Sequence, residues 1–281
     1  MRHLLAPLML AAAAAGPWSV AQAQLLGGVI GDTVTFSASV QTSASEVYGF
    51  PAGPRRCYPG QELVTTRVCS DADTAASTQP GETIATLSFI EPPLNTPPNA
   101  RVQGDGAAFH DAQTTSRGYL KRYEASVDAL SHITGPNRGD MEADANAGTG
   151  VEFAVLSLLR PTVAQLSGTL RVRATDPQQT FIEPAFQAAY PGLLLKLERV
   201  GGEVVFEASV APVPGGEFAE LAVDETLTLA NGRYRLSLVS GARVIHLSAV
   251  FASIGNGKVS EAQAGGEFVL TLDNHLLRLL P

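Results

Sequence analysis

Apolar and polar residues alternate along most of the chain after residue 30, and clusters of Gly, Pro, Asn and Asp separate the alternating runs. A period of two is typical of a strand with one buried face, whereas an amphipathic helix repeats every 3.6 residues. The pattern predicts strands at 33–41, 62–68, 83–90, 120–127, 151–159, 167–174, 193–200, 203–210, 226–229, 234–239, 244–251 and 267–272. Only 117–130 also fits a helix, because Tyr119, Tyr123 and Val127 recur at helical spacing.

Strands without intervening helices cannot form parallel crossovers, so the sheets are expected to be mainly antiparallel. The sequence therefore predicts an all-β fold, a two-sheet β-sandwich that is jelly-roll-like. Four prolines lie between 91 and 99, and a polar run follows them. Because proline excludes pairing in a central strand, we expect a surface excursion at about 91–116, within one domain over 24–281 or at a boundary between two.

Two turns are specified by their residues. Gly201 and Gly202 separate two alternating runs and predict a two-residue hairpin, since glycine supplies the positive φ of primed turns. Asn231 and Gly232 predict a second hairpin in the same way. Tyr234 follows that turn, so it is either a tyrosine corner, whose phenol bonds back to nearby backbone, or an ordinary half-buried strand residue.

The first residues have the features of an export signal. Arg2 and His3 precede an apolar run over 4–15, and 21–23 (AQA) has the small residues that signal peptidase recognises. The run is shorter than the ~20 residues that span a bilayer. We therefore expect a signal peptide over 1–23 and a secreted mature chain, extracellular or periplasmic, without membrane insertion. Cys57 and Cys69 are the only cysteines, and in an exported chain they predict a disulfide bond.

The charge excludes one class of partner. The chain has 19 Lys and Arg against 27 Asp and Glu, a formal net charge of −8 and a pI near 5.1. This sign is wrong for nucleic acid, whose phosphates attract basic proteins. The sequence contains neither a phosphate-binding loop nor a dinucleotide glycine motif, so no nucleotide cofactor is expected. Since no catalytic motif was found either, we expect a noncatalytic protein.

One acidic run resembles a cation loop. Asp140, Glu142, Asp144 and Asn146 place oxygen ligands at every second residue, as a hard cation such as calcium requires. The run is not an EF-hand, because the sixth position lacks glycine and the twelfth lacks glutamate. Two interpretations remain: a looser calcium site completed by Asp71 or Asp73, and a solvated acidic loop. The scattered histidines have no zinc spacing.

Aromatic residues bear on sugar binding, which relies on exposed rings. The single tryptophan, Trp18, lies within the predicted signal peptide. A concave face lined by tyrosines would still favour sugar binding. The candidates are Tyr48, Tyr58, Tyr119 and Tyr123.

Three segments, 30–34 (IGDTV), 151–172 and 227–236, resemble exported bacterial β-sandwich proteins of the PEP-CTERM-associated type. After Asp273 the sequence has no Pro-Glu-Pro, hydrophobic span or basic tail, so the sorting tail itself is not expected. The resemblance implies association with extracellular matrix. We therefore expect a noncatalytic structural or surface-contact component of the matrix or periplasm, in contact with extracellular polysaccharide or another matrix protein. The alternative is a carbohydrate-binding module or carbohydrate-active enzyme.

Overall fold

The computed structural model describes residues 34–48, 68–79, 81–86, 101–115, 118–134, 139–156, 161–175, 180–182, 185–248 and 259–273. Every regular element within these ranges is a strand, which confirms the all-β prediction. Residues 120–130, whose pattern also fitted a helix, are part of a strand. The strands are β1 (Val34–Tyr48), β2 (Val68–Ser77), β3 (Gly81–Thr86), β4 (Arg101–Thr114), β5 (Leu120–Thr134), β6 (Gly139–Val155), β7 (Thr162–Ala174), β8 (Thr180–Ile182), β9 (Ala185–Arg199), β10 (Glu203–Ser209), β11 (Ala219–Leu229), β12 (Gly232–Ser248) and β13 (Val259–Asp273).

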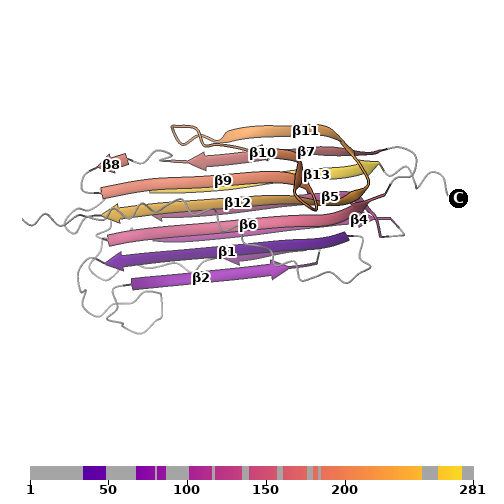
Figure 1. The fold of residues 1–281 in the computed structure, drawn as a ribbon. Coiled ribbons are helices and arrows are strands. Elements are labelled where there is room, and N and C mark those ends of the chain that lie inside the picture. The colour runs from indigo at the N-terminus through magenta and orange to yellow at the C-terminus, as the bar shows by residue number, and fades with distance from the viewer. Residues whose placement is uncertain are drawn as a thin grey trace, which may run out of the picture.

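The strands form two antiparallel sheets that pack face to face (Figure 1). The seven-stranded sheet has the order β10-β9-β12-β6-β1-β2, with β8 paired to β9. The six-stranded sheet has the order β11-β7-β13-β5-β4-β3. Strands at equivalent places in the two orders lie against each other: β6 contacts β5 and β4, and β9 contacts β13 and β7. The predicted β-sandwich is therefore confirmed.

The pairing within the sheets is that of a jelly roll. Strand β5 pairs with β13, β6 with β12, β7 with β11, and β9 with β10. In sequence, each pair of strands is therefore nested inside the previous pair. The nested pairs alternate between the two sheets, which is the wrapping that defines the fold. Strands β1 and β2 extend one sheet beside β6, and β4 and β3 extend the other beside β5.

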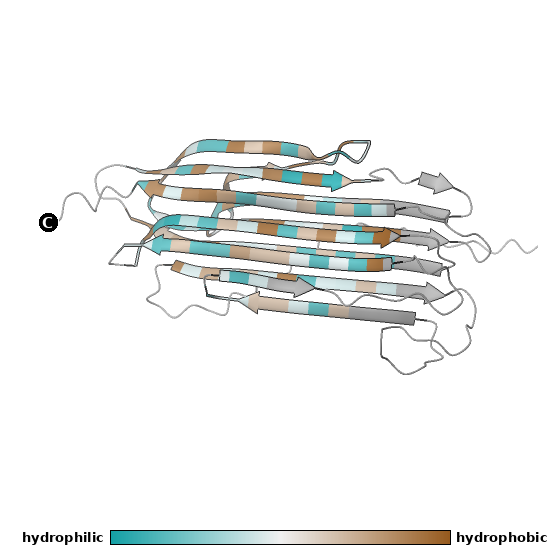
Figure 2. Ribbon diagram, turned by 180° about the vertical axis from the view of Figure 1, so that it is seen from behind, coloured by the Kyte–Doolittle hydropathy of each residue, from teal (hydrophilic) through white to brown (hydrophobic). Residues whose placement is uncertain are grey.

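Alternation along each strand positions the core. In β7 the even-numbered side chains from Thr162 to Ala174 face the other sheet, apart from Gly168, which has none, and most of the odd-numbered ones face solvent. Figure 2 shows the same exchange of hydrophilic and hydrophobic residues along other strands. Burial of the apolar face stabilises the sandwich by about 25 cal/mol per Å². The period-two prediction therefore holds along whole strands.

The core has two parts of different thickness. One part contains large side chains, among them Tyr123, Phe153 and Phe268. The other consists mostly of alanines, and there the sheets approach closely, because a Cβ on Gly104 in β4 would lie 2.9 Å from the carbonyl oxygen of Asp144 in β6. At this close approach Ser131 Oγ in β5 donates a 2.8 Å hydrogen bond to the Ala242 carbonyl in β12, so the sheets are also joined by polar contact.

The predicted hairpin at Asn231 and Gly232 is wrong. These residues connect β11 to β12, which belong to different sheets, so the turn carries the chain across the sandwich. Gly232 does not have a positive φ, and an added Cβ would meet only the end of the exposed Arg199 side chain, 2.9 Å from its Nε. Tyr234 is buried, and its Oη donates to the Ala230 carbonyl at 2.9 Å, the hydrogen bond that the tyrosine-corner interpretation requires.

The hairpin at Gly201 and Gly202 does join β9 to β10, and both glycines have positive φ. The turn has three residues rather than two, because Arg199 pairs directly with Glu203 and Gly202 N donates to the Arg199 carbonyl. The backbone of Val200 bonds instead to Arg233 of β12.

The surface excursion predicted at 91–116 is wrong for most of its length. Residues 101–114 form β4, which pairs with β3 and β5 and contributes buried residues to the core. The signal peptide over 1–23 and Cys57 lie outside the described residues, and of Cys69 only the backbone, in β2, is described. Within the described ranges there is no apolar helix of membrane-spanning length.

A substitution at Gly168 tests how closely β7 and β13 of the six-stranded sheet approach each other. A Cβ there would lie 2.1 Å from the Glu267 carbonyl oxygen and 2.7 Å from Cα of Phe268, so backbone would have to move. We expect Gly168→Ala to lower the free energy of unfolding by about 1–3 kcal/mol. The control Gly148→Ala, whose Cβ would make only contacts of 3.7–3.9 Å, should raise it by up to about 1 kcal/mol. Urea denaturation followed by circular dichroism measures both, and equal effects would contradict the packing described.

Candidate functional site

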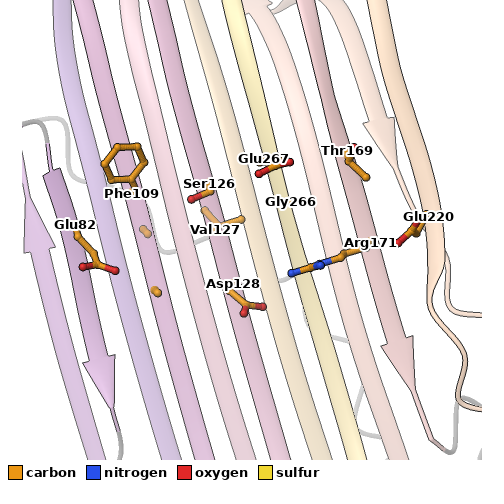
Figure 3. Close-up of a pocket in the computed structure, with 12 residues that line it drawn as sticks. Glu82, Phe109, Ser126, Val127, Asp128, Thr169, Arg171, Glu220, Gly266 and Glu267 are labelled. Atoms are coloured by element: carbon orange, nitrogen blue, oxygen red, sulfur yellow. The ribbon is translucent and has the colours of Figure 1, made fainter.

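A groove of about 340 Å³ crosses the outer face of the six-stranded sheet, and we call it the outer groove. Every strand of that sheet contributes to it (Figure 3). Its lining residues are Glu82, Ala107, Ala108, Phe109, Ser126, Val127, Asp128, Thr169, Arg171, Glu220, Gly266 and Glu267. Because the side chains stand on paired strands rather than on loops, their positions are set by the sheet.

Two neighbouring rows of cross-strand pairs build the outer groove. The first row runs from Glu82 in β3 through Phe109 and Ser126 to Glu267 and Thr169. The second runs from Ala107 through Asp128 and Gly265 to Arg171 and Glu220. Small residues in these rows form a low floor between longer side chains. The groove therefore runs across the strands and not along them.

Gly265 leaves room for the two charged side chains on the strands beside it. It lies between Asp128 and Arg171 in the second row, and a Cβ there would be 2.9 Å from Oδ1 of Asp128. In Figure 3 the Arg171 guanidinium extends from β7 over β13 toward Asp128, away from Glu220, its own cross-strand partner. The guanidinium carbon of Arg171 lies 5.8 Å from the centroid of the Phe218 ring. The outer groove thus contains a positive group among carboxylates.

The outer groove has an excess of negative charge. Glu82, Asp128, Glu220 and Glu267 line it, and none of them forms an ion pair with another described residue. Glu82, Glu220 and Glu267 are exposed, whereas Asp128 is half-buried and accepts a 3.4 Å hydrogen bond from Gln263. Their oxygens are available as hydrogen-bond acceptors.

The outer face of the seven-stranded sheet is different. Glu152 in β6 lies 2.5 Å from Arg235 in β12, and the same arginine lies 3.5 Å from Glu198 in β9. Lys196 gives Glu198 a second partner at 2.6 Å. Opposite charges on neighbouring strands stabilise a sheet, and here they neutralise each other.

The acidic run proposed as a calcium loop is part of β6, so the prediction of a loop is wrong. Glu142, Asp144 and Asn146 project from its outer face, because the alanines between them are buried. Arg243 of β12 lies 2.7 Å from Glu142, and Asn146 donates a 2.5 Å hydrogen bond to Asp144. Burial raises the pKa of Asp144 despite the opposing effects of Arg243 and Asn146. Of Asp140 only the backbone is described.

The residues proposed to complete that site do not join it. Asp73 pairs with Thr42, whereas Asp144 pairs with Ser43, so the two carboxyl groups point to opposite faces of the sheet. The side chain of Asp71 is outside the described residues. Nowhere in the described ranges do three or more His, Cys, Asp or Glu side chains gather as metal ligands.

The two candidate tyrosines whose side chains are described, Tyr119 and Tyr123, do not form a sugar-binding platform. Tyr123 is fully buried between the sheets, and Tyr119 is half-buried just before β5. Tyr58 and the side chain of Tyr48 lie outside the described residues. The aromatic residue of the outer groove is Phe109 instead. It escaped the sequence interpretation because its strand was taken for a surface excursion, although small and polar residues alternate there.

A second cluster of titratable groups is enclosed between the sheets. His110 Nε2 lies 2.6 Å from the Gln79 carbonyl, and His110 Nδ1 lies 3.4 Å from the Tyr123 hydroxyl. Tyr123 Oη is also 2.8 Å from Thr149 Oγ1. Phe36 packs against both rings. Burial raises the pKa of Tyr123, and the hydrogen bond to Thr149 opposes this only in part. His110, Tyr123 and Thr149 are buried, so the cluster connects the sheets but does not face a ligand.

Comparisons with known proteins do not assign a family. No protein-family model and no curated protein matches the chain. A structure of infectious bursal disease virus, Gx strain, is 12% identical, with a TM-score of 0.20, over 88% of this chain and 66% of that chain. Isomalto-dextranase of Arthrobacter globiformis T6, complexed with panose, is 16% identical, with a TM-score of 0.17, over 86% of this chain and 35% of that chain. The chain spans about two thirds of the viral chain, and scores this low carry no argument.

The buried phenol of Tyr123 is expected to make the free energy of unfolding decrease at alkaline pH. Because its folded-state pKa is above that of an exposed phenol, about 10, stability present below pH 10 is lost as the pH rises. We expect Tyr123→Phe to lower the free energy of unfolding by about 1–3 kcal/mol at neutral pH, since Thr149 loses its partner. The variant should also lose much of the alkaline decline, which for one phenol is up to about 1.4 kcal/mol per pH unit.

Urea denaturation at a series of pH values measures both effects. Below pH 9 the two proteins should follow parallel curves, which serves as the internal control. An alkaline decline of the same steepness in both proteins would show that Tyr123 does not cause it. A residual decline is expected in the variant, because burial also raises the pKa of Tyr234.

Proposed function

We propose that this protein is a secreted, noncatalytic β-sandwich protein that binds an extracellular polysaccharide by surface contact through the outer groove, as a component of the matrix or periplasm. The outer groove is the observation that carries the proposal. It combines one aromatic ring, carboxylates, a guanidinium and two hydroxyls on a rigid sheet face. Polysaccharides offer ring faces and many hydroxyl groups, which need this mixture of apolar contact and hydrogen bonds.

The shape of the outer groove supports an extended ligand. It is open toward solvent along the sheet face and crosses from β3 at one edge to β11 at the other. Adjacent strands are ~4.8 Å apart, so the five steps from β3 to β11 cover roughly 24 Å. A polymer chain fits such a path better than a compact small molecule, which favours an enclosed cavity.

Binding without catalysis is supported by the placement of the protein's perturbed groups. Burial raises the pKa of Tyr123 and of Asp144, and neither side chain lines the outer groove. Tyr123 is enclosed between the sheets, and Asp144 stands on the opposite outer face. Cleavage of a glycosidic bond needs a carboxylic acid kept protonated by its surroundings, with a second carboxylate at a set distance. Three of the four carboxylates in the outer groove are exposed to water.

A glycan array on the mature protein, with and without calcium, tests the proposal. We expect one class of extended glycan to bind and Phe109→Ala to weaken that binding by about tenfold, as loss of a central aromatic contact does. Val204→Ala is the matched control, because Val204 is exposed on β10, remote from the outer groove. Binding should not require calcium, since the acidic row of β6 lies on the opposite outer face, where Arg243 forms an ion pair with Glu142.

Two results would contradict the proposal. Shortened products released from the bound glycan, detected by chromatography, would show catalysis. Equal loss of binding in Phe109→Ala and Val204→Ala, with unchanged circular dichroism, would place the contact surface elsewhere.

A further inference from the structure

We infer that the occupant of the outer groove is a cationic polysaccharide, a polymer of amino sugars with free amino groups. The inference rests on the proposed function and adds the chemical class of the ligand. The charges that line the groove, and their contrast with the other face of the sandwich, carry it.

The outer groove concentrates negative charge along its whole length. Glu82 lies at the β3 edge, Asp128 and Glu267 lie in the middle, and Glu220 lies at the β11 edge. Arg171 is the single basic residue of the lining. The chain as a whole has a net charge of −8, so its long-range field also attracts cations. A polymer with an ammonium group on successive units would find a carboxylate at either end and in the middle.

The negative charge of the groove is compensated only in part, by Arg171, the single basic residue of its lining. On the seven-stranded sheet, Glu152 and Glu198 share Arg235, and Glu142 has Arg243. On the six-stranded sheet, Asp128 in β5 and Glu267 in β13 are diagonal neighbours, because Asp128 pairs with Gly265. Like charges on neighbouring strands repel each other, although at diagonal positions the repulsion is weaker than between directly opposite residues. Locally unfavourable arrangements are expected at binding sites, where the ligand supplies the missing charge.

The alternative of a basic peptide fits the outer groove less well. An extended peptide usually binds a sheet by pairing with an exposed edge strand. The outer groove lies on a face, and the central strands β4, β5, β13 and β7 already pair on both sides. Only side chains are therefore available to a ligand there. Phe109 presents an apolar surface suited to a sugar ring, and Ser126 and Thr169 add hydroxyls.

Arg171 limits the ligand further. Its guanidinium lies over β13 within the groove and points toward Asp128. Guanidinium groups donate hydrogen bonds and accept none, so this position matches a hydroxyl or acetyl oxygen of the ligand rather than an ammonium group. We therefore expect a polymer that offers both amino groups and neutral oxygens, as a partly acetylated amino-sugar chain does.

Isothermal titration calorimetry with two matched ligands tests this inference. The probes are a chitosan oligosaccharide and its fully N-acetylated counterpart of the same length, at slightly acidic pH, where the free amino groups are charged. The triple variant Glu82→Gln, Asp128→Asn, Glu267→Gln removes three of the four carboxylates that line the groove. The control triple Glu207→Gln, Glu217→Gln, Glu225→Gln changes the net charge equally at exposed positions outside the groove lining.

We expect the native protein to bind the chitosan oligosaccharide on the order of tenfold more tightly than the acetylated form, because several exposed charge contacts together reach that size. The groove variant should lose this preference, and the control triple should keep it. Added salt should weaken binding of the chitosan oligosaccharide more than that of the acetylated form.

The outcomes separate the inference from the proposed function. If both oligosaccharides bind equally and Phe109→Ala weakens both, the polysaccharide function stands and the cationic ligand is wrong. If oligolysine binds and both oligosaccharides do not, the occupant is a basic peptide, and both statements are overturned. If the control triple loses the preference as fully as the groove variant, the effect is one of net charge, and the inference is wrong.

Discussion

Contact between the two inner sheet faces is the constraint on which the rest of the structure depends. A Cβ on Gly106 would lie 2.4 Å from Val40 of the other sheet, so the space between the sheets is filled. Each long strand must therefore keep the same alternating face buried. Some polar groups between the sheets have partners there, as Ser131 and the pair Tyr123 and Thr149 do, whereas Thr42 Oγ1 and Thr83 Oγ1 have none among the described residues. With the inside occupied, the outer faces are the surfaces on which strand residues can meet a ligand.

The carboxylates of the outer groove are paired differently from those of the seven-stranded sheet, although outside the groove the six-stranded sheet also has ion pairs, Arg173 with Glu261 and Arg122 with Glu124. On the seven-stranded sheet the acidic residues of β6 meet arginines of β12, so the charges cancel where strands adjoin. On the six-stranded sheet the cross-strand partners of Asp128 are Gly265 and Ala107, which cannot neutralise it. Arg171 reaches in from β7 but leaves the lining with an excess of carboxylates. The difference lies in residue choice and not in backbone shape, which is why it is informative about function.

Period-two alternation was sufficient to predict the all-β fold and the sandwich, since a buried face is visible in neighbouring residues, but it missed β4, whose residues were predicted to form a surface excursion. Two local sequence patterns led to wrong predictions. Asn231 and Gly232 match the sequence of a hairpin turn, but β12 pairs with β6 and β9. Because these partners are distant in sequence, the residues of the turn do not indicate them. The acidic run around Asp144 indicated a loop, although the alanines between its members signalled a strand. The outer groove was not predictable, because its lining comes from six separate strands.

Gly265 and Gly266 connect the outer groove to the core. The two residues are adjacent in β13 and therefore face opposite sides of the sheet. On the inner side a Cβ at Gly266 would lie 2.9 Å from Leu170, so its absence makes room for core packing. On the outer side the absence of a Cβ at Gly265 leaves room for Asp128 and for the Arg171 guanidinium. One segment of backbone is therefore both the floor of the groove and part of the core packing, so the core packing fixes the position of the floor. A ligand would then order only side-chain ends when it binds, and this preorganisation lowers the entropic cost of association.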